Sequence, residues 1–121
     1  MERRRFLRLV RQALEGLPES FLDMLENVDV VVEPRPSRGV LRDAGVGPGE
    51  TLFGLYQGIP RTERDSYGMV LPDKISIYQE PLEDEFSDEA ELIEEIRVTV
   101  LHELAHHFGM SDEQLHNLGL G

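Results

Sequence analysis

The sequence predicts an α+β fold, in which a small mixed or antiparallel sheet of three to four strands packs on one long C-terminal helix, with further helices at the N-terminus. Apolar residues recur at helical spacing at both ends of the chain, and short β-branched runs bounded by glycine and proline lie between them. A length of 121 residues suits a single hydrophobic core. We therefore expect one domain over residues 1–121.

The N-terminal segment is expected to form two helices. Between Glu2 and Leu17 the apolar residues lie on one side of a helix and the arginines on the other, and the helix should end near Gly16 and Pro18. Residues 18–26 predict a short second helix. In an acidic protein the arginine face is expected to pair with the protein's own carboxylates.

Four short segments have the composition of strands. Each is rich in β-branched or aromatic residues and is bounded by turn-forming residues; they are residues 28–33, 51–58, 66–71 and 74–79. Gly54 interrupts the second segment and suggests a β-bulge. Residues 34–39 are expected to form a turn or loop between the first two strands.

The acidic run from residue 80 to residue 95 predicts a solvated surface that leads into a long helix. Pro81 is expected to start a loop. Asp88, followed three residues later by Glu91, has the form of a capping box, so the helix should begin near Asp88. It should continue to Gly109, a residue type that commonly follows a helix end.

Charge and cysteine content narrow the possible functions. There are 24 acidic and 12 basic residues, a net charge of -12, which repels phosphate backbones and argues against nucleic acid as a partner. No apolar run is long enough to span a membrane. Arg8 and Arg11 interrupt the stretch that a signal peptide would need, so a cytoplasmic location is expected. Because cysteine is absent, any metal must take nitrogen and oxygen ligands.

The segment His102 to His106 reads H-E-L-A-H, which has the HExxH spacing. On a helix the two imidazoles lie one turn apart, separated by about 40°, and can hold one cation. Glu103 stands at about 100°, beside the pair and not between them. It is therefore placed as a general base for a water molecule and not as a ligand.

A catalytic zinc site normally needs a third protein ligand. Gly109 can end the helix and let the chain return Asp112 to the metal, which gives the pattern HExxHxxGxxD. His116, which could lie on a short last helix, and Glu113 remain alternatives.

These residues resemble the small bacterial zincin-like metallopeptidases often called minimal zincins, which look like metzincins reduced to one short domain. The resemblance rests on residues 102–112, and the methionine turn of true metzincins is missing. It implies a minimal zincin-like fold, one Zn²⁺ ion held by His102, His106 and Asp112, and a peptide or protein substrate. Hydrolysis would use a metal-bound water activated by Glu103. The substrate would lie along an edge strand, for which residues 66–71 or 74–79 are the candidates.

Further residues have expected roles around this site. An apolar stripe opposite the histidines should pack on the sheet; it comprises Ile93, Ile96, Val100, Leu104 and Phe108. His107 is expected to be packed in the core or to support a ligand. Glu95 and Thr99 precede the histidines on the cleft face, either as supporting partners or, for Glu95, simply solvated. Tyr67 and Tyr78 are candidate donors to the oxyanion.

Two other functions remain open. The first is a zinc-binding interaction or regulatory module that has the zincin framework but little or no turnover. The second is metal-dependent hydrolysis of another substrate such as RNA, which the negative charge disfavours. The oligomeric state is not predicted.

Overall fold

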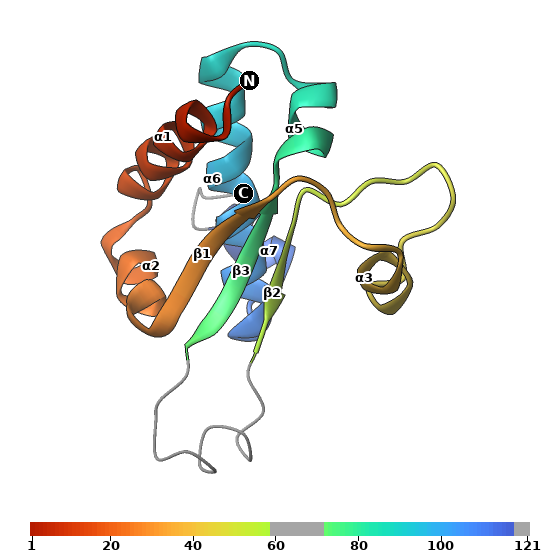
Figure 1. Ribbon diagram of the computed structural model, residues 1–121. Coiled ribbons are helices and arrows are strands. Elements are labelled where there is room, and N and C mark those ends of the chain that lie inside the picture. The colour runs from red at the N-terminus through yellow and green to blue at the C-terminus, as the bar shows by residue number, and fades with distance from the viewer. Residues whose placement is uncertain (59–71, 118–121) are drawn as a thin grey trace.

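The computed structural model describes residues 1–58 and 72–117 (Figure 1). Its elements in chain order are α1 (Arg3–Glu15), α2 (Glu19–Met24), the 3-10 helix η1 (Leu25–Asn27), β1 (Val28–Glu33), α3 (Arg38–Asp43), β2 (Gly54–Gln57), β3 (Asp73–Tyr78), α5 (Gln79–Glu85), α6 (Glu89–His107) and α7 (Asp112–Asn117). Among these residues, no helix combines the length and the hydropathy needed to cross a membrane.

The three described strands form one mixed sheet in the order β1-β3-β2. β3 pairs in parallel with β1, from Val28 opposite Asp73, and antiparallel with β2, from Gly54 opposite Ile77. The fold is therefore the predicted α+β class with a long helix. Three of the four strand predictions are confirmed, and the fourth, residues 66–71, lies outside the described residues.

β3 is the central strand, which corrects one expectation. Residues 74–79 cannot supply a free edge for substrate, because β3 has a neighbour on each side. The strand next to α6 whose outer side carries no described strand is β2. The edge nearest the HExxH helix is thus supplied by a strand that the sequence argument had not chosen.

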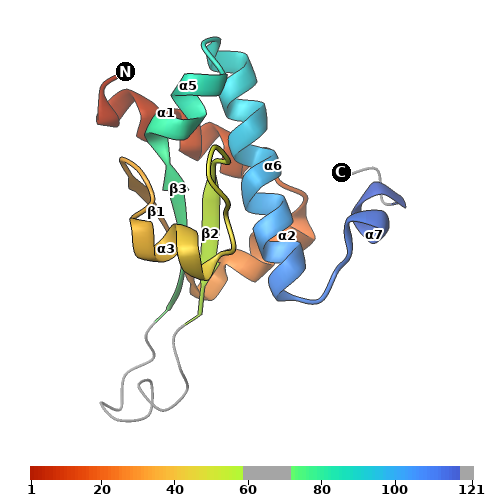
Figure 2. The same ribbon diagram turned by 90° about the vertical axis from the view of Figure 1, so that its right-hand side faces the viewer.

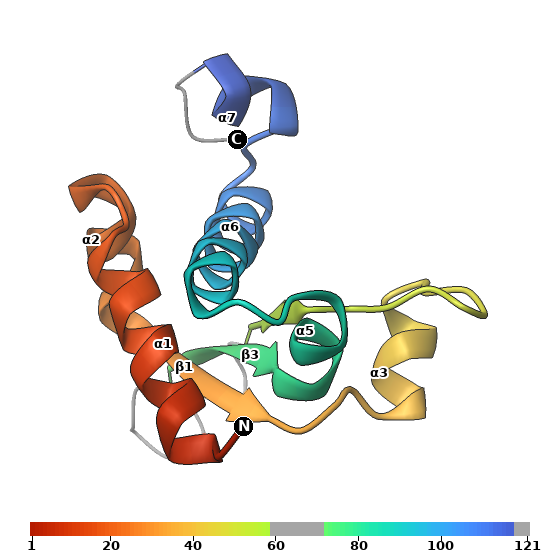
Figure 3. The same cartoon turned by 90° about the horizontal axis from the view of Figure 1, so that it is seen from above.

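α6 packs against the sheet and α1 through its apolar residues. Those with at most 1% exposure are Leu92, Ile96, Val100, Leu101, Leu104 and Ala105. Ile75 and Ile77 of β3 and Phe6 of α1 are fully buried in the same cluster. α6 lies along one face of the strands (Figure 2), α3 lies beside the sheet beyond β2 (Figure 1), and α7 lies on the side of α6 that faces away from the sheet (Figure 3). The rotation of α6 about its axis is therefore set by its buried face.

Two helices occur where loops were expected. Residues 38–43 form α3, capped by Ser37, whose hydroxyl accepts a hydrogen bond from the Val40 N–H at 3.1 Å. Residues 79–85 form α5, in which Leu82 is fully buried. The acidic composition concealed α5, because one buried leucine is enough to anchor two turns while the carboxylates stay at the surface.

The bulge expected at Gly54 is wrong, since the ladder between β2 and β3 runs without interruption through that residue. Glycine is needed there for a close approach of three elements. A Cβ atom at position 54 would lie 2.7 Å from Cγ2 of Thr99 on α6 and 2.9 Å from the carbonyl oxygen of Ser76 on β3. Both distances are far below van der Waals contact, so only glycine lets β2 lie this close to α6.

We predict that Gly54→Ala destabilises the fold by about 1–3 kcal/mol, because the added methyl forces β2 and α6 apart. The melting temperature should fall by about 4–8 °C for each kcal/mol, as measured by calorimetry. Gly39→Ala is the matched control, since nothing lies closer than 3.8 Å to its added Cβ. Equal melting temperatures for the two variants would contradict the close approach.

Candidate active site

The helix that carries the HExxH sequence has the predicted limits. Asp88 caps its N-terminus by accepting a hydrogen bond from the Glu91 N–H at 3.1 Å. At the other end Gly109 has a φ of 81°, in the left-handed region that releases the chain from the helix. The Met110 N–H donates to the Ala105 carbonyl at 2.7 Å and closes this turn. The direction in which the chain continues toward Asp112 is therefore fixed by local bonds.

His102 and His106 lie on one side of α6, with their ring centroids 6.1 Å apart. His102 is half-buried, whereas the side chain of His106 is 52% exposed. The two rings therefore stand beside each other at the surface of the helix, as the one-turn spacing requires. Both rings are at least partly exposed to solvent.

Glu103 contacts the edge of the sheet. Its Oε1 atom accepts a hydrogen bond of 2.9 Å from the backbone N–H of Tyr56, in the middle of β2. A single hydrogen bond from a rigid strand holds the carboxylate in one orientation. The Oε2 atom is left as the oxygen that can accept a proton from a water molecule.

Tyr56 connects several groups beside the helix end. Its ring stacks on His107 with centroids 3.9 Å apart, and its hydroxyl donates to Oδ2 of Asp73 at 2.5 Å. Nε2 of His107 lies 3.9 Å from the same Asp73 oxygen. These contacts tie β2 and β3 to the last turn of α6. The sequence argument missed Tyr56 and Asp73, which no motif marks.

The apolar stripe predicted on α6 is wrong at its C-terminal end. Phe108 is 53% exposed, and His107 is also exposed instead of being packed in the core. Leu101 and Ala105 are buried in addition to the predicted residues. The last turn extends past the main core, so His107 and Phe108 meet Tyr56 and each other instead of the sheet interior.

Asp112 is the acidic residue that reaches the histidine pair. It begins α7, and its Oδ1 atom lies 3.0 Å from Nε2 of His106. Glu113 and His116 follow on the same short helix and are exposed. In the described chain the residues after Gly109 therefore bring Asp112, and neither alternative, into contact with His106.

The donor set suits zinc, although the side chains do not yet converge. Among the described residues, no three histidine or carboxylate groups lie close enough together to hold a metal ion. On one tetrahedral zinc, two donor atoms are about 3.4 Å apart and two imidazole centroids about 5 Å apart. The 3.0 Å between His106 and Asp112 is a hydrogen-bond distance, about 0.4 Å shorter than the first value, and the 6.1 Å between the rings of His102 and His106 exceeds the second by about 1 Å. The residue types fit the ion, because two imidazoles and one carboxylate are ligands that zinc takes in catalytic sites.

A cleft of about 350 Å³ opens beside His102 and Glu103. The segment leading into β2 and the middle of α6 form its walls, with the lining residues Thr51, Leu52, Phe53, Gly54, Glu95, Val98, Thr99, His102 and Glu103. Its lining mixes apolar side chains, such as Leu52 and Phe53, with polar and charged ones. The cleft thus adjoins the general-base candidate and one predicted metal ligand.

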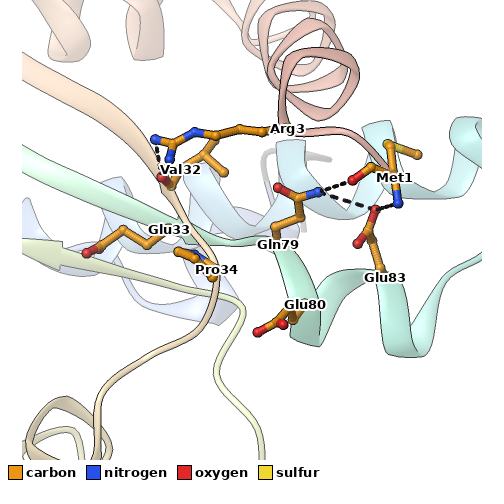
Figure 4. Close-up of a pocket in the computed structure, with 8 residues that line it drawn as sticks. All are labelled: Met1, Arg3, Val32, Glu33, Pro34, Gln79, Glu80 and Glu83. Carbon is orange, nitrogen blue, oxygen red and sulfur yellow. Dashed lines mark hydrogen bonds and ion pairs between the residues drawn. The ribbon is translucent and has the colours of Figure 1, made fainter.

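A second hollow, of about 320 Å³, lies near the N-terminus (Figure 4). Its polar groups already bond to one another: the Met1 amine lies 3.3 Å from Glu83, and Gln79 donates to the Met1 carbonyl at 2.9 Å. Arg3 donates to the Val32 carbonyl at 2.9 Å. The hollow contains none of the predicted site residues.

Tyr78, one of the two tyrosines expected near an oxyanion, does not line the cleft. Tyr78 is 2% exposed, and burial together with the nearby Glu33 carboxylate raises the pKa of its hydroxyl. A buried hydroxyl cannot reach a substrate. Tyr67 lies outside the described residues.

A helix bearing HExxH, an edge strand bonded to its glutamate and a cleft beside them define the zincin class of metallopeptidase folds. The family model for zincin-like metallopeptidases matches residues 25–121, and the chain belongs to that family. Among solved structures, a conserved hypothetical protein from Thermus thermophilus is similar, with 25% identity and a TM-score of 0.57 over 97% of this chain and 99% of that one. No curated protein matches.

The bond between Glu103 and Tyr56 predicts a difference between two substitutions. Glu103→Ala removes the oxygen that accepts the 2.9 Å hydrogen bond from the Tyr56 N–H and should cost about 1 kcal/mol. Glu103→Gln keeps an amide oxygen that can accept the same hydrogen bond, and should stay close to the wild type. Unfolding in urea with a chelator present measures the stability of each variant without a contribution from bound metal. Equal stability of the alanine and glutamine variants would show that the bond does not form.

Proposed function

We propose that the protein is a zinc-dependent peptidase in which His102, His106 and Asp112 hold one Zn²⁺ ion and Glu103 is the general base. The observation that carries this proposal is the position of Glu103, which stands beside the histidine pair with one carboxylate oxygen fixed by the Tyr56 N–H. Family membership supports the same reading. A cytoplasmic location remains a prediction from the sequence.

Zinc, when bound, would polarise the peptide carbonyl and lower the pKa of the attacking water. Glu103 would accept a proton from that water through Oε2 and then pass it to the departing amine. The bond to Tyr56 holds the carboxylate in one orientation beside the cleft. Binding of zinc to His106 also requires that Nε2, which lies 3.0 Å from Oδ1 of Asp112, carries no proton.

β2 is the strand best placed to align an extended substrate. The Tyr78 N–H donates to the Phe53 carbonyl at 2.9 Å, so alternate residues of this strand bond to β3. Gly54 lies between two of the residues that bond to β3. Its backbone groups therefore point away from β3, and it lines the cleft. A peptide could add to this edge by main-chain hydrogen bonds, with its scissile bond near His102 and Glu103.

Metal analysis tests the proposed ligands. Alanine at His102, His106 or Asp112 should weaken zinc binding by about a hundredfold or more, because even the loss of an outer partner costs about 10- to 100-fold. Alanine at Glu113 or His116 is the matched control and should leave the affinity unchanged. Zinc content after dialysis and competition with a chromogenic chelator measure both. Loss of zinc with His116→Ala but not with Asp112→Ala would overturn the ligand assignment.

Peptide hydrolysis tests the role of Glu103. The zinc-loaded Glu103→Gln variant should retain its metal and lose about 10²- to 10⁴-fold in kcat, the usual contribution of a general base. Glu91→Gln removes the same charge from an exposed position on the same helix and should not change kcat. Cleavage of a peptide library followed by mass spectrometry gives the readout. A zinc-loaded wild type that cleaves no peptide would instead favour a binding module.

A further inference from the structure

Glu95 lies in the cleft that leads to Glu103, two helical turns before His102. It is half-buried, and Thr99 stands between it and His102 on the cleft wall. The Thr99 hydroxyl donates to the Glu95 backbone carbonyl at 2.7 Å, so it does not engage the Glu95 carboxylate. The side chain of Glu95 is thereby left to face the cleft contents.

No cation in the described chain lies within ion-pair distance of the Glu95 carboxylate. The nearest arginine in sequence, Arg97, bonds to Glu94, with its Nε 3.0 Å from Oε2. That hydrogen bond lowers the pKa of the Glu94 carboxyl. Glu95 therefore differs from its neighbour, which already has a partner.

The charged side chains that line the cleft are both acidic. Its lining contains two carboxylates, Glu95 and Glu103, and no lysine or arginine. Leu52, Phe53 and Val98 form apolar walls that reduce solvent screening and can contact the aliphatic part of a long basic side chain. An acidic group entering this cleft would meet two like charges.

We propose that Glu95 is a specificity-determining residue that binds a positively charged group of the substrate, either a basic side chain or the free amino terminus. This inference rests on the proposed peptidase function. Seven residues along α6 correspond to about 10 Å between Glu95 and His102. An extended peptide advances about 3.3 Å per residue, so the cationic group belongs within about three residues of the scissile bond.

The test uses zinc-loaded protein and peptides that are identical except for lysine, norleucine or glutamate at one position, each with a free or an acetylated amino terminus. We expect the wild type to prefer lysine over norleucine by about two- to fivefold in kcat/KM, because an ion pair that is partly screened by solvent contributes up to about 1 kcal/mol. Glu95→Gln should abolish the preference and Glu95→Lys should reverse it toward glutamate. A preference that acetylation removes would assign the amino terminus as the bound group.

Glu91→Gln is the matched control and should keep the wild-type preference.

Equilibrium binding of the same peptides to the zinc-loaded Glu103→Gln protein, measured by fluorescence anisotropy, separates this inference from the proposed function. Lysine-selective binding that needs Glu95, without cleavage by the wild type, would uphold the specificity and end the peptidase proposal. The role of Glu95 would be overturned if peptides were cleaved or bound with no preference for lysine or for a free amino terminus. It would also be overturned if the preference were unchanged in Glu95→Gln, or if the peptides were neither cleaved nor bound.

Discussion

The burial of one face of α6 is the constraint on which the candidate site depends. Val100, Leu101 and Leu104 are fully buried, so the helix cannot rotate without exposing them. Their burial contributes several kcal/mol, because each large aliphatic side chain is worth about 1.5–3 kcal/mol. With that face fixed, His102 and His106 must project from the other side of the helix. The packing of the core thus sets the direction in which His102 and His106 point, although neither residue belongs to the core.

The second determinant is how closely β2 approaches α6. Gly54 removes the side chain that would keep them apart, and two residues later the Tyr56 N–H reaches Glu103. The same tyrosine is tied to Asp73 and His107 by its ring and hydroxyl. A glutamate on a helix is normally free to sample several rotamers in water. Here a backbone group of the sheet selects one of them.

Sequence patterns were sufficient wherever the signal is local. Asp88 and Gly109 marked the ends of α6 because capping and left-handed backbone depend on neighbouring residues only. Helix α5 was missed because its acidity resembles that of a solvated loop. Phe108 was expected in the core because a periodic pattern does not reveal where a helix leaves the sheet. The contact between Tyr56 and Glu103 joins residues 47 positions apart, and no spacing rule encodes it.

We propose that His102, His106 and Asp112 converge on one ion. X-ray absorption spectroscopy of the zinc-loaded protein, compared with a crystal structure at the zinc edge, measures this directly. The account predicts two imidazole nitrogens and one carboxylate oxygen at about 2.0–2.2 Å, from these three residues, with a solvent molecule completing four-coordination. Zinc bound at another position, or ligated through His107 or His116 in place of Asp112, would contradict it.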